Sequence, residues 1–136
     1  MIWMLDTNIV VYLMNRKPGY RKIARRMSGR SPAEVRLSAI TLAELRFGIE
    51  WGEFRAENEA ALGSFLEFLQ TDDFPAGAAG DFGRIKAALL TKGEPIGPYD
   101  ILIAAHARHI GATLVTNNES EFRRVPGLSV QNWLKP

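Results

Sequence analysis

Two short runs of hydrophobic residues each end abruptly in a cluster of polar side chains. The first run, residues 1–5, is apolar at every position and stops at Asp6. The second run, residues 112–116, is rich in β-branched residues and stops at Asn117. Strands in the middle of a parallel sheet are buried on both faces, so both runs are predicted to be strands of this kind.

The remaining apolar positions mostly follow helical spacing, interrupted by turns at proline and glycine. The predicted helices cover residues 9–14, 19–28, 41–49, 51–70, 76–90 and 98–110. Further strands are predicted at 35–40 and 128–130, while 71–75 either breaks the preceding helix or forms a short strand. This alternation predicts an α/β fold, in which a small parallel sheet of about four to five strands is flanked by helices.

The length and composition of the chain narrow the class of protein. A chain of 136 residues is expected to form a single domain, residues 1–136, with a core of its own. It contains no cysteine, which excludes disulfides and thiolate metal sites and is typical of the reducing cytoplasm. No apolar run approaches the roughly 18 residues that span a bilayer, and no signal peptide is predicted. We therefore expect a cytoplasmic protein without membrane contact.

The net charge is only +2, but positive charge is concentrated in one predicted helix. Residues 19–28 include Arg21, Lys22, Arg25 and Arg26, which form two like-charged pairs at a spacing of four. Such pairs weaken an isolated helix by a few tenths of a kcal/mol, roughly. This face is either simply solvated or binds an anionic partner, which would be phosphate or an acidic protein segment.

Acidic residues recur where the predicted elements begin or end. Asp6 follows the first predicted strand, and Glu119 and Glu121 follow the predicted strand at residues 112–116. Glu44 and Asp100 lie near the starts of predicted helices. In a parallel sheet with crossover helices these positions share one edge, so the acids are expected to converge. Each acid also has a local explanation, as a helix cap or a partner of a helix dipole.

Glu44 has the strongest structural alternative, because it stands three residues after Thr41 in the pattern of a helix capping box. A cluster of carboxylates without histidine or cysteine would instead suit a hard cation, Mg²⁺ or Mn²⁺. His106 is a poor ligand, since six residues place it about 240° around a helix from Asp100. A divalent ion would offset the repulsion of the acids and activate water for attack on a phosphodiester.

Four segments, taken in order, carry a resemblance to a known family. They are Met4–Asn8, Leu37–Leu45, Ile96–Asp100 with Ile103–Ala107, and Leu114–Asn118 with Glu121–Phe122, and they span almost the whole chain. With these segments the sequence resembles a PIN domain, and more closely a VapC-type toxin ribonuclease of a type II toxin–antitoxin system. The resemblance implies a small parallel sheet flanked by helices and metal-dependent cleavage of RNA.

The resemblance also implies roles for individual residues. Asp6 and Asp100 correspond to the main metal-binding acids of the family, and Glu44 corresponds to its second acid. Many PIN domains have an aspartate where this chain has Asn118, so the fourth acid is sought in the region from Asn118 to Glu121, with Glu121 expected to serve. Supporting polar positions are matched by Asn8, Thr116 and Asn118.

We therefore predict an Mg²⁺-dependent endoribonuclease, with Mn²⁺ as an alternative ion. Asp6 and Asp100 would hold the metal, Glu44 would orient a metal-bound water, and Glu121 would complete the site. The basic residues Arg21, Lys22, Arg25 and Arg26 would hold the RNA backbone. The resemblance further implies a VapB-like antitoxin, an RNA substrate such as tRNA, and pairing of the toxin into homodimers.

Two other functions fit parts of the sequence. A phosphatase of the haloacid-dehalogenase type also places an aspartate after its first strand, but it needs a second aspartate two residues later, where this chain has Asn8. A catalytically silent PIN-like module that binds RNA or a protein partner is the other alternative. Retention of Asp6, Glu44 and Asp100 disfavours it.

Overall fold

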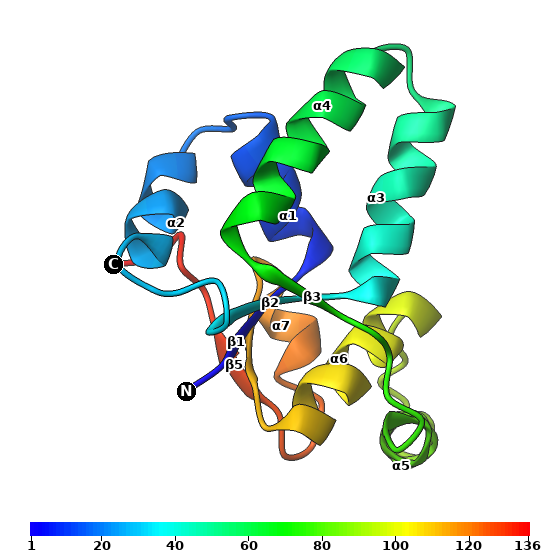
Figure 1. Cartoon of the computed structure of the whole chain (residues 1–136). Coiled ribbons are helices and arrows are strands. Elements are labelled where there is room, and N and C mark those ends of the chain that lie inside the picture. Colours follow the sequence, from blue (N-terminus) through cyan, green and yellow to red (C-terminus); the bar gives the residue numbers. More distant parts are fainter.

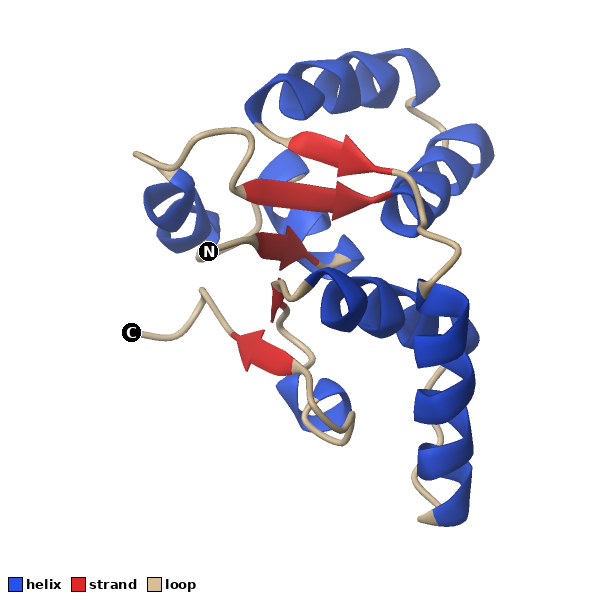
Figure 2. Cartoon of the chain, turned by 60° about the horizontal axis from the view of Figure 1, so that its bottom comes forward, coloured by secondary structure: helices blue, strands red, loops and turns tan.

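The computed structural model describes all 136 residues and contains one sheet of five strands in the order β3-β2-β1-β4-β5. Every neighbouring pair of strands is parallel. The strands are β1 (Trp3–Leu5), β2 (Val35–Ser38), β3 (Gln70–Asp72), β4 (Thr113–Val115) and β5 (Ser129–Gln131). The predicted α/β fold with a small parallel sheet is confirmed (Figures 1 and 2).

Helices cover both faces of this sheet (Figure 2). One core cluster draws on the helices of the first half of the chain, and the other draws on those of the second half. The first group is α1 (Thr7–Met14), α2 (Tyr20–Met27), α3 (Ala39–Trp51) and α4 (Arg55–Phe65), followed by a 3₁₀ turn, η1 (Leu66–Phe68). The second group is α5 (Ala78–Thr91), α6 (Pro98–Ile110) and α7 (Glu119–Phe122). No helix has the length and hydrophobicity needed to cross a membrane.

Strand β1 shows why its sequence is apolar at consecutive positions. Met4 and Leu5 are both fully buried, but Met4 packs with the core on the α5–α6 side and Leu5 with the core on the α1–α4 side. Successive side chains of a strand point to opposite faces, so a strand covered on both faces needs hydrophobic residues at every position. The central position of β1 also puts its carboxyl end in the middle of one sheet edge.

Several predicted boundaries are wrong in detail. Helix α1 begins at Thr7 rather than residue 9, and strand β2 ends at Ser38 rather than residue 40. The helix predicted over 51–70 is shorter, because α3 continues to Trp51 and the extended backbone of Gly52 (ψ 169°) ends it, while α4 covers only Arg55–Phe65. The 3₁₀ turn η1 follows α4, and β3 begins at Gln70, which confirms the short strand that was one of the two possibilities for 71–75. Phe54, which lies inside the predicted range 51–70, is 65% exposed in the turn between α3 and α4.

Helix α6 matches its predicted range from residue 98 to residue 110. Pro98 occupies the first turn, where the missing N–H of proline costs no hydrogen bond. Gly111 adopts φ 72°, a left-handed conformation that favours glycine and ends the helix. Pro98 fixes the start of α6, and with it the position of Asp100 in the first turn, and Gly111 fixes its end.

Candidate active site

Asp6 lies at the carboxyl end of β1 and serves as the N-cap of α1. One carboxylate oxygen accepts a hydrogen bond from the backbone N–H of Thr7 at 2.8 Å. The other accepts one from the Thr116 hydroxyl at the end of β4, also at 2.8 Å. Burial raises the pKa of Asp6, Glu44 adds to this, and the two hydrogen bonds act against it. The carboxylate is therefore held firmly in place at the sheet edge.

Glu44 does not close the capping box predicted for Thr41. The N-cap of α3 is Ser38, whose hydroxyl accepts a hydrogen bond from the backbone N–H of Ile40 at 3.1 Å, so α3 starts before Thr41. Thr41 is buried inside the helix, and Glu44 lies a turn further along it. The Glu44 carboxylate accepts a hydrogen bond from the Thr7 hydroxyl at 2.7 Å. Glu44 is thus directed toward the end of β1 instead of toward its own helix start.

Asp100 opens α6 on the other side of the same cleft. The cleft has a volume of about 340 Å³ and an open mouth, and its lining includes Asp6, Glu44, Asp100 and Asn118. Partial burial and the negative charges of Asp6, Glu44 and Glu121 raise the pKa of Asp100 to about 6. The structure therefore brings three of the predicted acids to one cleft, where they repel one another.

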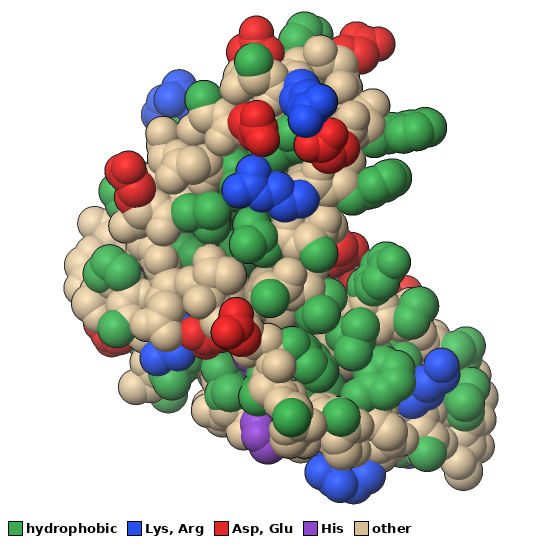
Figure 3. Space-filling view, turned by 45° about the vertical axis from the view of Figure 1, so that its right-hand side comes forward, with side chains coloured by type: hydrophobic (Ala, Val, Ile, Leu, Met, Phe, Trp, Pro, Cys, Tyr) green, Lys and Arg blue, Asp and Glu red, His purple; other side chains and the backbone are tan.

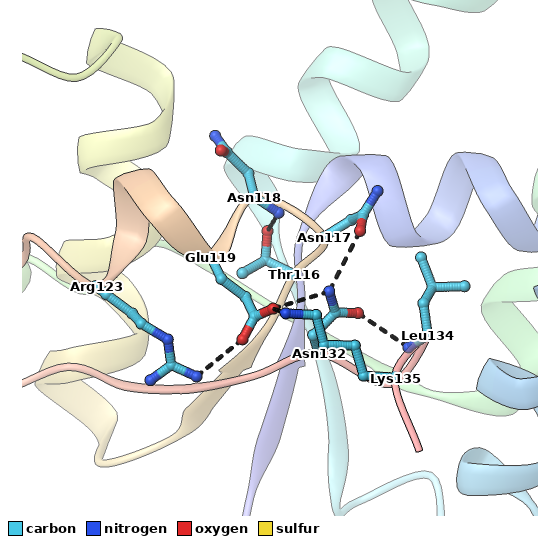
Figure 4. A network of polar contacts seen from close by, with 8 residues as sticks. All are labelled: Thr116, Asn117, Asn118, Glu119, Arg123, Asn132, Leu134 and Lys135. Carbon is cyan, nitrogen blue, oxygen red and sulfur yellow. Dashed lines mark hydrogen bonds and ion pairs between the residues drawn. The ribbon is translucent and has the colours of Figure 1, made fainter.

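The two remaining acids at this edge have different surroundings. Glu121 accepts a hydrogen bond from the Asn118 side chain at 2.9 Å, so it lies behind Asn118 and does not itself line the cleft. Glu119 turns away toward the C-terminal segment and binds Arg123, Asn132 and Lys135 (Figure 4). Those three partners lower the pKa of Glu119 to about 2. Of these two acids, only Glu121 is among the negative charges that raise the pKa of Asp100.

The supporting polar residues join the ends of β1 and β4. Besides donating to Asp6, the hydroxyl of Thr116 accepts the backbone N–H of Asn118 at 2.9 Å, as Figure 4 shows. The side-chain oxygen of Asn8 lies 3.5 Å from the backbone nitrogen of Asn117. Asn8 and Asn118 both line the cleft. These contacts fix the loop after β4 beside Asp6.

A buried histidine that sequence reasoning set aside connects the two helices that carry Glu44 and Asp100. His106 on α6 is fully buried, and its Nδ1 lies 2.8 Å from the Ser38 hydroxyl at the start of α3. Its Nε2 has no hydrogen-bond partner. Ser38 and His106 are 68 residues apart, so no local pattern could have indicated this contact.

The predicted basic residues lie apart from the acids. Arg21, Lys22, Arg25 and Arg26 are exposed on α2, and none of them lines the acidic cleft. The basic residue that does line the cleft is Lys17, which precedes α2 in the chain. Its ammonium group lies 5.4 Å from the centre of the Tyr12 ring.

The donor chemistry of the cleft fits a hard cation. The acids lining it offer carboxylate oxygens, which are the ligands that Mg²⁺ prefers. No thiolate or imidazole lines the cleft. None of Asp6, Glu44, Asp100 and Glu121 forms an ion pair with a basic side chain. No three acidic or histidine side chains are gathered closely enough to form a complete ligand set as they stand. The carboxylates would have to draw together around an ion.

Comparison with known proteins identifies the family. The family model described as the PIN domain matches residues 3–128. Ribonuclease VapC2 of Rickettsia felis is 40% identical over 99% of this chain and 100% of its own length. The tRNA(fMet)-specific endonuclease VapC of Shigella flexneri is 37% identical over 96% of this chain and 97% of its own.

Solved structures agree with the sequence comparison. A DNA-bound VapBC from Salmonella typhimurium superposes with a TM-score of 0.91 at 38% identity and covers 98% of both chains. A VapBC2 from Rickettsia felis bound to a promoter DNA fragment gives a TM-score of 0.88 at 39% identity, covering 98% of this chain and 99% of that one. The resemblance inferred from the four sequence segments is confirmed. The chain belongs to the PIN-domain family and, within it, to the VapC ribonucleases.

Proposed function

We propose that this chain is the ribonuclease toxin of a VapBC-type toxin–antitoxin pair and that it cleaves RNA with the help of Mg²⁺, with Mn²⁺ as an alternative ion. The observation that carries the proposal is the convergence of Asp6, Glu44 and Asp100 on one cleft without any basic ion-pair partner. The VapC relatives, which are named ribonucleases or endonucleases, support the class of reaction. Because the proposed substrate is RNA, we propose that the protein acts in the cytoplasm.

In the proposed mechanism Asp6 and Asp100 would hold the ion, Glu44 would orient a water, and Glu121, which accepts a hydrogen bond from Asn118, would complete the site. When bound, the ion would activate water and stabilise the departing oxygen of the phosphodiester. The hydrogen bonds from Thr7 and Thr116 fix the Asp6 carboxylate, so that little reorganisation is needed at this residue.

The other residues of the cleft would receive the substrate. Lys17 lies at the cleft and is positioned to contact a phosphate of the strand being cut. Glu44 accepts a hydrogen bond from Thr7 and lines the same cleft. Its carboxylate would orient the attacking water. Asn8 and Asn118 supply neutral donors and acceptors around the acids.

The relatives also suggest the substrate and the partner. The Shigella flexneri protein is named for cleavage of tRNA(fMet), so we propose tRNA as a substrate of this chain. The matching solved structures include VapBC complexes, and a VapB-like antitoxin is the proposed partner here.

We further propose a homodimer formed through an apolar groove between α3 and α6. The groove borders Glu44 and is lined by Ile40, Ala43, Phe47, Tyr99 and Leu102. Phe47 stacks on Trp51 at 6.2 Å, and Phe47, Trp51 and Tyr99 are each at least 60% exposed. Figure 3 shows hydrophobic side chains gathered around a hollow on this face. Burying such aromatic residues against a second copy would contribute about 25 cal/mol per Å² of apolar area.

Light scattering on purified protein tests the homodimer. We expect the combined Phe47→Ser and Trp51→Ser variant to have the mass of a monomer, with Phe68→Ser as a control, since Phe68 is equally exposed on the 3₁₀ turn η1. A dimeric double variant that no longer binds the antitoxin would contradict the proposal and assign this groove to the antitoxin.

Incubation of the purified protein with total RNA or tRNA tests the ribonuclease activity. We expect shortened RNA with Mg²⁺, none with EDTA, and none from an Asp6→Asn variant, whereas Asp73→Asn on an exposed loop should cut normally. Cleavage that persists in EDTA would refute the metal-dependent mechanism. Release of inorganic phosphate from small esters would indicate a phosphatase, and RNA that is retarded in a gel but not shortened would indicate a binding module.

A further inference from the structure

A second hollow, lined almost entirely by basic residues, lies between α2 and the C-terminal segment. Its volume is about 480 Å³. The side chains lining it are Lys22, Arg25, Arg26, Arg30, Trp133 and Lys135, with Pro136. Lys135 pairs with Glu119, but none of the other basic residues here has an acidic partner. The hollow therefore concentrates positive charge that the protein itself does not neutralise.

Arg30 is held in this hollow by aromatic rings rather than by a carboxylate. Its guanidinium carbon lies 4.3 Å from the centre of the Trp3 ring and 5.1 Å from that of Trp133. No acceptor in the protein binds the guanidinium, and its Nε is buried without a partner. Stacking on tryptophan stabilises the cation and fixes the plane of the group. The terminal N–H groups of this guanidinium have no acceptor in the protein either, and they are the donors that would bind a phosphate.

Two separate segments connect residues beside the acidic cleft with residues that line the basic hollow. In the first, Lys17 lines the cleft and Lys22, only five residues later, lines the hollow. In the second, the Asn132 side chain donates to the Asn117 side chain at 3.3 Å, next to Asn118 of the cleft (Figure 4). Trp133, the residue after Asn132, lines the hollow. Both segments therefore lead from residues beside the cleft to residues that line the hollow.

We propose that this hollow binds phosphates of the RNA strand adjoining the scissile bond. The proposal rests on the proposed ribonuclease function and adds Arg30, Lys135 and the C-terminal segment to the predicted basic face of α2. Arg21 is not part of it, because its guanidinium Nε lies 3.4 Å from the Tyr20 hydroxyl and it does not line the hollow. RNA is favoured over an acidic peptide because two segments link this hollow to the cleft in which the strand would be cut.

Fluorescence anisotropy of a labelled single-stranded RNA, measured in EDTA, tests this site without any cleavage. We expect the Arg25→Ala/Arg26→Ala variant to bind about tenfold more weakly, with the slope of log K against log salt reduced by about 1.4, because each lost phosphate contact removes about 0.7. The control is Arg46→Ala/Arg55→Ala, which removes the same charge from two exposed side chains of α3 and α4. It should bind within about twofold of wild type, since neither residue lines the hollow or the cleft.

Arg30 is tested separately through its stacking. Arg30→Lys keeps the charge but loses the planar fork, so we expect weaker RNA binding than wild type at an unchanged net charge. RNA that occupies the hollow should also change the fluorescence of Trp133 in wild type, and a Trp133→Phe variant identifies that signal.

Three outcomes would overturn the proposal. The first is equal RNA affinity in the α2 variant and the control, and the second is equal weakening of both. The third is displacement of the RNA by polyglutamate at the same concentration of charge, which would assign the hollow to an acidic protein segment. Absence of RNA cleavage by wild type and all variants would contradict the ribonuclease proposal alone. Because RNA binding is measured without metal, the difference in affinity between the α2 variant and the control would still decide whether the hollow binds RNA.

Discussion

Two acidic residues at the same edge of the sheet have opposite surroundings. Glu119 is bound by Arg123, Asn132 and Lys135, which lower its pKa to about 2. Asp100 has no basic partner, and its burial and neighbouring carboxylates raise its pKa to about 6. The fully paired Glu119 therefore stabilises the fold. Asp100, in a cleft with two more acids, is available for a ligand.

Removing the charge of Asp100 should separate activity from stability most clearly. We expect Asp100→Asn to lower RNA cleavage by at least about 10³-fold, the equivalent of about 4 kcal/mol of lost transition-state stabilisation. In metal-free buffer at pH 7.5 the same variant should melt at a higher temperature than wild type, because it relieves the repulsion from Asp6 and Glu44. Paired kinetics and calorimetry check both effects, and a fall in both activity and melting temperature would contradict this account of Asp100.

The contact between Ser38 and His106 tests how strictly the unpaired acids must be placed. Ser38→Ala removes the cap of α3, at a cost of about 1 kcal/mol, together with its contact to α6. We expect a loss of activity of about 10-fold, within the range found for residues that orient metal ligands. Ser64→Ala, on the exposed side of α4, is the control. A Ser38→Ala protein that is less stable but cleaves RNA at the wild-type rate would show that the contact does not position the acids.

Acidification should affect the two acids in opposite directions. The pKa of Asp100 is raised in the folded state, so without metal its penalty is present above about pH 6 and is relieved as the pH falls toward 3.8. Mg²⁺ must displace the proton that Asp100 takes up, so the rise in melting temperature caused by Mg²⁺ should shrink as the pH falls through about 6. Thermal melts at pH 7.5 and 5.5, with and without Mg²⁺, measure this. An equal Mg²⁺ effect at both pH values would exclude Asp100 as a ligand.

Glu119 should give the smallest and purely structural effect. Its lowered pKa means that its contribution to stability is present above about pH 4.5 and is lost as the pH falls toward 2. We expect Glu119→Gln to lower the melting temperature at pH 7 by about 2–4 °C and to leave RNA cleavage within about threefold of wild type. A large loss of cleavage with an unchanged fold would return Glu119 to the group of candidate metal ligands.

Sequence reasoning located the acids of the cleft because their placement follows from a general rule. Asp6, Glu44 and Asp100 each lie near the junction of a strand and a helix or at a helix start, and a parallel sheet brings such junctions to one edge. The position of α6 was also predictable, since Pro98 and Gly111 mark its two ends locally. Information of this kind is contained in a few neighbouring residues.

Other features depended on contacts between distant parts of the chain. Both Ser38 and Thr41 are good helix caps, and only the observed end of β2 shows that Ser38 is used and that Glu44 is free of the cap. The partners of Glu119 include Asn132 and Lys135 in the C-terminal segment, which nothing in the local sequence connects to it. For the same reason the local sequence predicted only one side of the basic hollow, the charged helix α2, and not the C-terminal segment that forms its other side.

The double use of Asp6 determines how an inactive form of this toxin should be made for work on its antitoxin. Alanine at this position would remove a carboxylate from the cleft and also the acceptor that starts α1, at a cost of about 1 kcal/mol. A partner that recognises the shape of α1 would then meet an altered surface, and weakened association would be ascribed wrongly to the missing charge. Asparagine is an equally good first residue for a helix, so it silences the chemistry while leaving that surface intact.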